Sequence, residues 1–198
     1  MTFIVIEGGE GVGKSTQVDL LVERLQAAGH VVDKTHEPGG TPKGVELRRR
    51  LLHDPRDVGP DEELELMLED RRIHLAERIV PDLERGVVVV CDRFSPSTLA
   101  YQGVARGLGL DNVEAKIRTV TGSVEPDVVV VLDLPDAVAE ARLTGDRDRF
   151  ERAGAEFHAR VRAAYRELAP DRGWMIIDAS GSVAEVAERV WAAVEPHL

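Results

Sequence analysis

The sequence of 198 residues predicts a three-layer α/β domain, in which a parallel sheet lies between two layers of helices. Apolar runs rich in β-branched residues recur along the chain, such as "FIVIE" at 3–7 and "VVVVCD" at 87–92. They do not alternate with polar residues, which is typical of strands buried on both faces of a sheet. Segments with helical spacing of apolar residues separate these runs, and this alternation favours right-handed βαβ units.

The elements can be placed in order along the chain. Gly29 ends the first helical segment, while Pro60 opens the longest one and Gly86 closes it. We expect strands at residues 3–7, 31–37, 87–92, 128–134 and 174–178. We expect helices at residues 14–28, 43–53, 60–85, 96–106, 111–122, 136–145, 153–169 and 182–194. No repeat or linker interrupts the pattern, so one domain is expected over residues 1–198.

Composition and charge limit the possible functions. Lys and Arg number 25 against 36 Asp and Glu, and the net charge of −11 argues against general nucleic-acid binding, which requires a basic surface. The apolar runs are about half the length of a membrane-spanning helix, and the first residues lack the basic region of a signal peptide. We therefore expect a cytoplasmic protein without a membrane partner. Cys91 is expected to be a buried strand residue rather than a reactive thiol.

A glycine-rich loop, "EGGEGVGKST" at 7–16, lies between the first predicted strand and the first predicted helix. Its pattern G-x4-G-K-S is that of a P-loop, whose backbone N–H groups and helix N-terminus bind phosphate oxygens. Lys14 reaches the outer phosphates, and the Ser15 hydroxyl can ligate Mg²⁺. This context favours a nucleoside triphosphate site over a plain glycine-rich turn. The predicted site comprises Gly8, Gly9, Glu10, Gly11, Val12, Gly13, Lys14, Ser15 and Thr16.

Glu10 is an acid within this phosphate-binding loop. Two like charges about 5 Å apart repel by roughly 3 kcal/mol at an effective dielectric constant of about 20, so an inward carboxylate would weaken triphosphate binding. We therefore expect Glu10 to point outward, toward whatever lies opposite the γ-phosphate, where it can accept a hydrogen bond from a sugar hydroxyl. The alternative is a solvated surface glutamate.

Polar residues also end two further predicted strands. Asp92 and Arg93 end one of them, and Glu37 ends another just before the turn at Pro38. Ligands of open α/β sheets bind beyond the carboxyl ends of the strands. We therefore expect Asp92 to help hold Mg²⁺ and Arg93 to bind a phosphate. The alternatives are a local ion pair and an ordinary turn.

Two predicted helices present binding groups. Met67, Asp70 and Arg71 lie three to four residues apart and share one face of the long helix. An apolar side chain beside an arginine suits a flat heterocycle with polar edges, although a core stripe flanked by solvated charges has the same spacing. The helix after Arg93 carries hydrogen-bonding side chains beside a rigid aromatic wall. These residues are Ser97, Thr98, Tyr101 and Gln102.

The most charged stretch, "GDRDRFERAG" at 145–154, lacks apolar periodicity and is expected to be exposed and mobile. It falls in a lid that we place at about residues 143–154. Arg147 and Arg149 lie in this lid. An arginine that a closing flap brings in stabilises the negative charge that develops during phosphoryl transfer. The alternative is a solvated run of charges.

Five motifs follow one another along nearly the whole chain: "IEGGEGVGKSTQ", "EPGGT", "DRFSPSTLAYQGVARG", "EPDVVVVLDLP" and "DRFE". In these motifs and in their order the chain resembles bacterial thymidylate kinases. The resemblance implies a P-loop nucleoside monophosphate kinase fold with a five-stranded parallel sheet and a mobile lid. It also implies a homodimer that transfers the γ-phosphate of ATP to dTMP with Mg²⁺, giving dTDP and ADP for dTTP biosynthesis.

Matching positions suggest individual roles. Glu10 resembles the acid that meets the 3′-hydroxyl of the acceptor sugar, and Arg93 resembles the arginine on the acceptor phosphate. Arg71 resembles the arginine at the thymine edge, and Tyr101 the tyrosine that crowds the 2′ position. The implied dTMP site comprises Glu10, Glu37, Pro38, Met67, Arg71, Arg93, Ser97, Thr98, Tyr101 and Gln102.

Two positions separate this chain from other members. Gly11 stands where some relatives carry a catalytic arginine, so the chain resembles the members with a lid arginine, here Arg147 or Arg149. Met67 stands where the family usually has a Phe that stacks on thymine; its sulfur can pack on a base but it has no ring. One alternative is therefore a kinase for another pyrimidine deoxynucleotide, such as dUMP or a 5-modified dUMP. Another is a non-catalytic ATP-binding switch protein, which leaves the acceptor-side residues unexplained.

Overall fold

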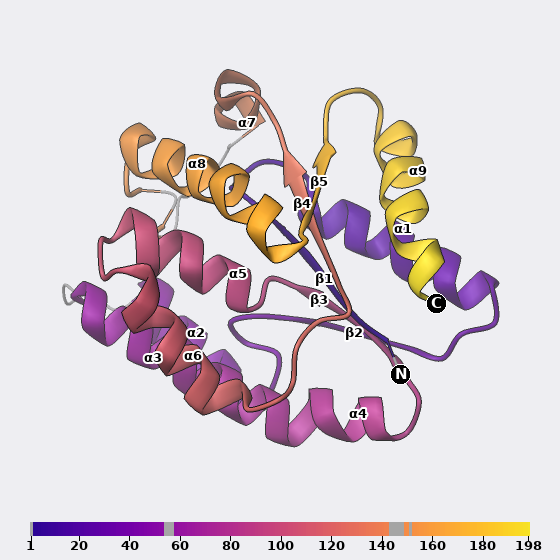
Figure 1. The fold of residues 1–198 in the computed structure, drawn as a ribbon, viewed down its shortest axis with the longest axis horizontal. Helices are drawn as coiled ribbons and strands as arrows, with labels where there is room; N and C mark the ends of the chain where they lie inside the picture. The colour runs from indigo at the N-terminus through magenta and orange to yellow at the C-terminus, as the bar shows by residue number, and fades with distance from the viewer. Residues whose placement is uncertain (1, 54–57, 143–148, 151) are drawn as a thin grey trace.

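The computed structural model describes residues 2–53, 58–142, 149–150 and 152–198. It contains a five-stranded parallel sheet with the strand order β2–β3–β1–β4–β5 (Figure 1). The strands are β1 (Phe3–Gly8), β2 (Val32–His36), β3 (Val88–Asp92), β4 (Val128–Asp133) and β5 (Met175–Asp178). The predicted α/β class and the five parallel strands are therefore confirmed.

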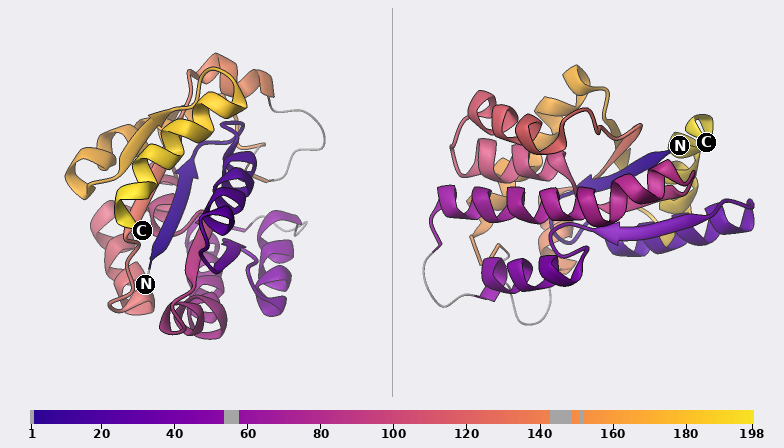
Figure 2. Two further views of the ribbon diagram at one scale, coloured as in Figure 1. Left: turned by 90° about the vertical axis from the view of Figure 1, so that its right-hand side faces the viewer. Right: turned by 90° about the horizontal axis from the view of Figure 1, so that it is seen from below.

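Helices cover both faces of the sheet, with α1 and α9 on one face and most of the others on the opposite face (Figures 1 and 2). The helices of the described residues are α1 (Lys14–Ala27), α2 (Pro42–His53), α3 (Pro60–His74), α4 (Val80–Glu84), α5 (Ser95–Thr98), α6 (Leu110–Thr121), α7 (Asp136–Arg142), α8 (Ala155–Arg172) and α9 (Val183–Val194).

Two hydrophobic cores lie on the two faces of the sheet. Successive side chains of a strand point to opposite faces, so Phe3 and Val5 pack into the core shared with α3, α6 and α8. Ile4 and Ile6 pack into the core shared with α1 and α9. The apolar run that predicted β1 is thus explained by burial on both sides.

The prediction that all strands are buried on both faces is wrong for β2 and β5. These are the two edges of the sheet. Lys34 and His36 of β2 are exposed, as are Ile176 and Asp178 of β5. An edge strand has a neighbour on one side only, and the helix layers do not extend over it completely.

The long helix predicted at 60–85 is continuous but changes its winding. A π-helical segment, Leu75–Ile79, connects α3 to α4. Pro81 has no N–H to donate to the preceding turn, which accounts for the local change. The helix predicted at 96–106 likewise continues from α5 as a π-helical segment, Leu99–Ala105, which carries Tyr101 and Gln102.

The predicted lid falls partly outside the described residues, because it includes 143–148 and 151. Within the described part, the expectation of an exposed segment is wrong at Phe150. Its side chain is buried and lies edge-to-face against Tyr101, with ring centroids 5.7 Å apart. Across the residues that the structure describes, no helix has the length and apolarity needed to cross a bilayer.

Candidate active site

The predicted site residues meet at the carboxyl ends of three adjacent strands. Asp92 of β3 is aligned with Ile6 of β1 and with His36 of β2. The glycine-rich loop, Arg93 and Glu37 therefore leave the sheet at one edge. The cavity there, which we call the phosphate cleft, has a volume of about 310 Å³ and is lined by Glu10, Lys14, Ser15, Val18, Lys34, Thr35, His36, Glu37, Arg48, Asp92 and Arg93.

The loop between β1 and α1 turns sharply because Gly11 and Gly13 have left-handed φ angles of 76° and 95°. It places backbone N–H groups and the N-terminus of α1 around the cleft, where they favour an anion. Lys14 is buried, and its Nζ donates a hydrogen bond to the carbonyl of Gly9 at 2.8 Å. Burial and then the charge of Arg93 lower the pKa of Lys14.

Ser15 and Asp92 form an oxygen-only pair beside this loop. Ser15 Oγ donates to Asp92 Oδ2 at 3.1 Å, while Asp92 Oδ1 is buried and has no hydrogen-bond partner among the described residues. Mg²⁺ prefers oxygen ligands and is commonly bound through one or two protein groups together with substrate phosphates. The residues present therefore fit a Mg²⁺ ion.

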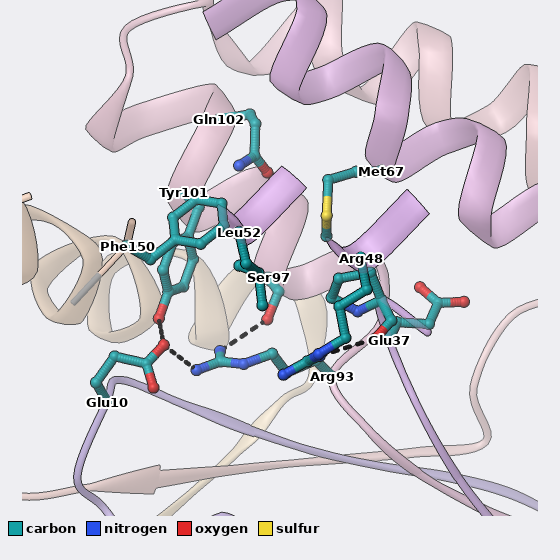
Figure 3. Close-up of a pocket in the computed structure, with 11 residues that line it drawn as sticks. Glu10, Glu37, Arg48, Leu52, Met67, Arg93, Ser97, Tyr101, Gln102 and Phe150 are labelled. Carbon is teal, nitrogen blue, oxygen red and sulfur yellow. Dashed lines mark hydrogen bonds and ion pairs between the residues drawn. The ribbon is translucent and has the colours of Figure 1, made fainter. Parts of the chain in front are cut away.

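Glu10 points away from the loop interior and lies between Arg93 and Tyr101 (Figure 3). Its Oε1 accepts hydrogen bonds from Arg93 Nη2 at 2.6 Å and from the Tyr101 hydroxyl at 2.9 Å. Burial disfavours its ionisation, but the charges of Arg93 and Lys14 outweigh this effect and lower the pKa of Glu10 to about 2. Glu10 is therefore an anion at neutral pH and is available to accept hydrogen bonds.

Arg93 is held in a strained turn. Its φ of 72° lies in the left-handed region, and it is the one non-glycine residue with positive φ in the described part of the chain. Its Nη1 donates to the carbonyl of Gly8 at 3.0 Å and to Ser97 Oγ at 3.1 Å. Backbone strain of this kind persists only where the surroundings fix it, and it is common in binding sites.

Glu7 fixes this turn, although no role was predicted for it from the sequence. This buried carboxylate at the end of β1 accepts hydrogen bonds from the backbone N–H groups of Phe94 and Ser97 and from the hydroxyls of Ser97 and Tyr165, at 2.6 to 3.1 Å. Burial raises the pKa of Glu7. The one available signal was a charged residue within an otherwise apolar strand, "FIVIE".

A second cavity, which we call the acceptor pocket, has a volume of about 100 Å³ and adjoins the phosphate cleft. Met67 lies on one side of it, and Tyr101 and Phe150 lie on the other (Figure 3). Its lining comprises Glu10, Glu37, Pro38, Arg48, Leu52, Met67, Arg93, Ser97, Tyr101, Gln102 and Phe150. Most of the residues predicted for the acceptor are thus brought together.

Arg71 and Thr98 are the predicted acceptor residues that do not line this pocket. Arg71 is fully buried behind its wall, where Nε donates to Glu37 Oε2 at 2.9 Å and Nη2 donates to Thr98 Oγ1 at 3.0 Å. Met67 takes part in the wall itself. Spacing along a helix predicted a shared face but not which side chain is outermost.

Arg48 of α2 was missed by the sequence analysis. It lines both cavities, and its Nη1 donates to the carbonyl of Pro38 at 2.8 Å. The run "LRRR" at 47–50 holds three arginines, and the sequence offers no way to choose the one that faces the site.

Of the two lid arginines, the structure describes Arg149, whereas Arg147 lies outside the described residues. Arg149 lies against α3, where Nη2 donates to the carbonyl of Val58 and Nε is 3.9 Å from Glu63 Oε2. Neither cavity is lined by Arg149 in this conformation.

Gly11 is packed against α7, and this contact predicts a loss of stability. A Cβ atom on Gly11 would overlap the carbonyl oxygen of Ala139, whereas one on Gly86, with nearly the same φ of 77° against 76°, would meet nothing within 4 Å. We expect Gly86→Ala to lower the free energy of unfolding by about 1 kcal/mol through the left-handed backbone alone, and Gly11→Ala by about 3 kcal/mol. Urea unfolding measures both; equal losses would contradict the close packing.

The raised pKa of Asp70 predicts that the stability of the fold depends on pH. Asp70 is buried and accepts a hydrogen bond from the backbone N–H of Gly39 at 3.0 Å. Burial, and then the charge of Glu37, raise its pKa from 3.8 to about 6. The folded state therefore binds this proton more tightly than the unfolded chain, so ionised Asp70 costs stability above about pH 6, and this cost disappears as the pH falls toward 4.

We expect Asp70→Asn, which retains an acceptor for Gly39, to raise the free energy of unfolding at pH 7.5 by about 2 kcal/mol. The gain should vanish below about pH 3.8, where the wild-type carboxyl is protonated in both the folded and the unfolded states. Urea unfolding at the two pH values measures this difference. A gain of the same size at both would show that ionisation of Asp70 is not its cause.

The P-loop at the end of β1, the oxygen pair beside it and the adjoining acceptor pocket define a P-loop nucleoside monophosphate kinase. Comparison with known proteins gives the family. The family model for thymidylate kinase matches residues 6–190. The chain belongs to the thymidylate kinase family, and it is therefore a phosphotransferase.

Individual relatives agree with this assignment. The chain is 49% identical to the thymidylate kinase of Synechococcus sp. (strain JA-2-3B'a(2-13)), with 99% of the chain and 95% of the relative covered. It is 44% identical to the thymidylate kinase of Leifsonia xyli, with 95% and 91% covered. It is 42% identical to that of Deinococcus radiodurans, with 97% and 95% covered.

Proposed function

We propose that the protein transfers the γ-phosphate of ATP to dTMP, giving ADP and dTDP. The observation that carries this proposal is the junction of the two cavities, which share Glu10, Glu37, Arg48 and Arg93. A donor phosphate in the phosphate cleft and an acceptor phosphate at Arg93 would then lie close together. Such proximity is most of what phosphoryl transfer needs from a protein.

Different charged residues bind the donor phosphates, the acceptor and Mg²⁺. The P-loop N–H groups and Lys14 hold the donor phosphates and stabilise the charge that develops on the transferred group. Arg93, fixed by Glu7 and Glu10, binds the acceptor phosphate, and Glu10 accepts a hydrogen bond from the acceptor sugar. Ser15 and Asp92 would hold Mg²⁺, which when bound neutralises phosphate charge.

The acceptor is tested by comparing dTMP, dUMP, dCMP and a 5-modified dUMP as substrates with ATP and Mg²⁺. We expect dTMP to have the highest kcat/KM. The relatives at 42–49% identity are thymidylate kinases, which supports dTMP over the other pyrimidines. A higher kcat/KM for another nucleotide would overturn dTMP as the substrate, and ATP binding without transfer to any of them would indicate a switch protein.

Gly11 carries no charge at the position where some relatives have a catalytic arginine. The lid arginines, Arg147 and Arg149, therefore supply the positive charge that stabilises the transferred phosphate. We expect Arg149→Ala to lower kcat by about tenfold to a hundredfold and to change the KM for dTMP less, because an arginine that acts in the transition state affects kcat. Steady-state kinetics with varied dTMP measures both constants. An effect confined to KM would place Arg149 in substrate binding and leave Arg147 as the catalytic arginine.

Homodimer formation and a cytoplasmic location also belong to this proposal. The homodimer is what the resemblance of the five motifs to the bacterial family implies, whereas the location is the expectation that the composition of the sequence suggests. Sedimentation of the purified protein measures the oligomeric state directly.

A further inference from the structure

A chain of buried polar side chains connects β2 to α3 and α5. Thr35 Oγ1 lies 2.6 Å from His74 Nε2, and His74 Nδ1 lies 3.0 Å from Glu37 Oε1. Beyond Glu37, the chain continues through Arg71 to Thr98 by the two hydrogen bonds described above. Each of these five residues is at most 2% exposed, so the chain is shielded from bulk solvent.

The chemistry of the groups fixes the direction of the central bonds. An ionised carboxylate only accepts hydrogen bonds and a guanidinium only donates them. His74 Nδ1–H therefore donates to Glu37, and Arg71 donates to the other oxygen of the same carboxylate. Glu37 is thus held by one donor on each oxygen.

The ring of His74 has no freedom to turn. The backbone of Gly40 lies directly on it, since a Cβ atom on Gly40 would overlap His74 Nε2. The imidazole is therefore a fixed support for Glu37. This contact also gives a physical reason for the second glycine of "EPGGT".

One nitrogen of Arg71 has no hydrogen-bond partner within the described part of the chain. Its guanidinium lies over the ring of Phe94, 4.7 Å from the centroid, and its Nε and Nη2 are bound. Nη1 is buried and has no hydrogen-bond acceptor among the described residues. A buried charged donor without an acceptor is costly. A carbonyl group of a ligand that enters from the adjoining acceptor pocket, past the wall that Met67 forms, would supply the acceptor.

We propose that His74 is a positioning residue for recognition of the acceptor base: it holds Glu37, and Glu37 holds Arg71 with Nη1 directed toward a base carbonyl. The inference rests on the proposed function and deepens it. Thymine carries a carbonyl oxygen at the position where cytosine carries an amino donor. A correctly held Arg71 therefore favours thymine over cytosine.

Two substitutions of His74 separate its two hydrogen bonds. In His74→Asn the amide nitrogen takes the place of Nδ1 and retains donation to Glu37. In His74→Gln the amide reaches the place of Nε2, retains the contact with Thr35 and loses Glu37. We expect His74→Gln to raise the KM for dTMP about tenfold with kcat within about threefold of wild type, and His74→Asn to stay within about threefold in both constants.

The ratio of kcat/KM for dTMP to that for dCMP is the readout that a general structural role would not move. We expect His74→Gln to lower this ratio about tenfold, because loss of the Arg71 direction affects only the base with a carbonyl at the position where cytosine carries its amino group. His30→Gln is the matched control, since His30 precedes β2 at the opposite end of the sheet from the site. This control should leave the ratio unchanged.

Thr35→Val provides the test if His74→Gln does not fold, because it retains side-chain volume and removes the other bond to the ring. We expect it to lower the dTMP-to-dCMP ratio about threefold. An unchanged ratio in folded His74→Gln or Thr35→Val would overturn the inference, as would equal losses in His74→Asn and His74→Gln. A wild-type protein without activity on dTMP would instead overturn the proposed function, so the two failures are distinguishable.

Discussion

Lys14→Ala is expected to lower kcat by about a thousandfold, because it removes a positive charge that stabilises the transferred phosphate in the transition state. Lys14 is buried at the P-loop and lies in a cleft that Arg93, a partly buried cation, also lines. Burial strengthens the electrostatic effect of such a charge, since little water screens it. A coupled assay of ADP release measures kcat directly.

Lys116→Ala is the matched control for this substitution. Lys116 is exposed on α6, where it pairs with Glu65 on the surface, and its loss should change kcat by less than about twofold. Circular dichroism and thermal unfolding establish that both variants are folded. A folded Lys14→Ala variant with nearly normal kcat would contradict the assigned role of Lys14.

Arg93→Met is expected to lower kcat/KM for dTMP by about a thousandfold while the KM for ATP changes less than about threefold. Methionine retains much of the length of arginine but provides no charge for the acceptor phosphate. The loss also leaves Glu10 without its closest cation, so the pKa of Glu10 rises from about 2. A partly buried carboxylate without a partner is an additional obstacle to binding an anionic acceptor.

Steady-state kinetics with each substrate varied in turn measures this effect. Arg24→Met is the matched control, because Arg24 pairs with Glu188 on the surface between α1 and α9. It should leave both constants close to wild type. An increase in the KM for ATP as large as that for dTMP would show that Arg93 belongs to the donor site.

Much of the fold was predictable because local patterns encode it. The three buried strands of the sheet centre are apolar runs, and their order with the helices specifies a parallel sheet. The P-loop was predictable because glycine permits φ angles that other residues avoid, so its spacing carries the backbone geometry of the loop. The exposure of β2 and β5 was not predictable, since it depends on strand order.

The site was predictable where a polar residue ends a strand, as with Asp92, Arg93 and Glu37. It was not predictable where a residue acts across elements distant in sequence. Glu7 holds a turn more than 80 residues away, and His74 supports Glu37 across 37 residues. Arg48 could not be told from its neighbours, because helix rotation decides which arginine faces the site.

The P-loop and the class of fold follow from the amino-acid sequence, because they depend on backbone freedom and on patterns that are close along the chain. The tertiary structure determines which partner each charged side chain has. It set Glu10 between Arg93 and Tyr101, and it placed Arg71 behind the pocket wall rather than in it. The reason is physical: the ionisation and direction of a buried group depend on partners that strand order and helix packing bring together.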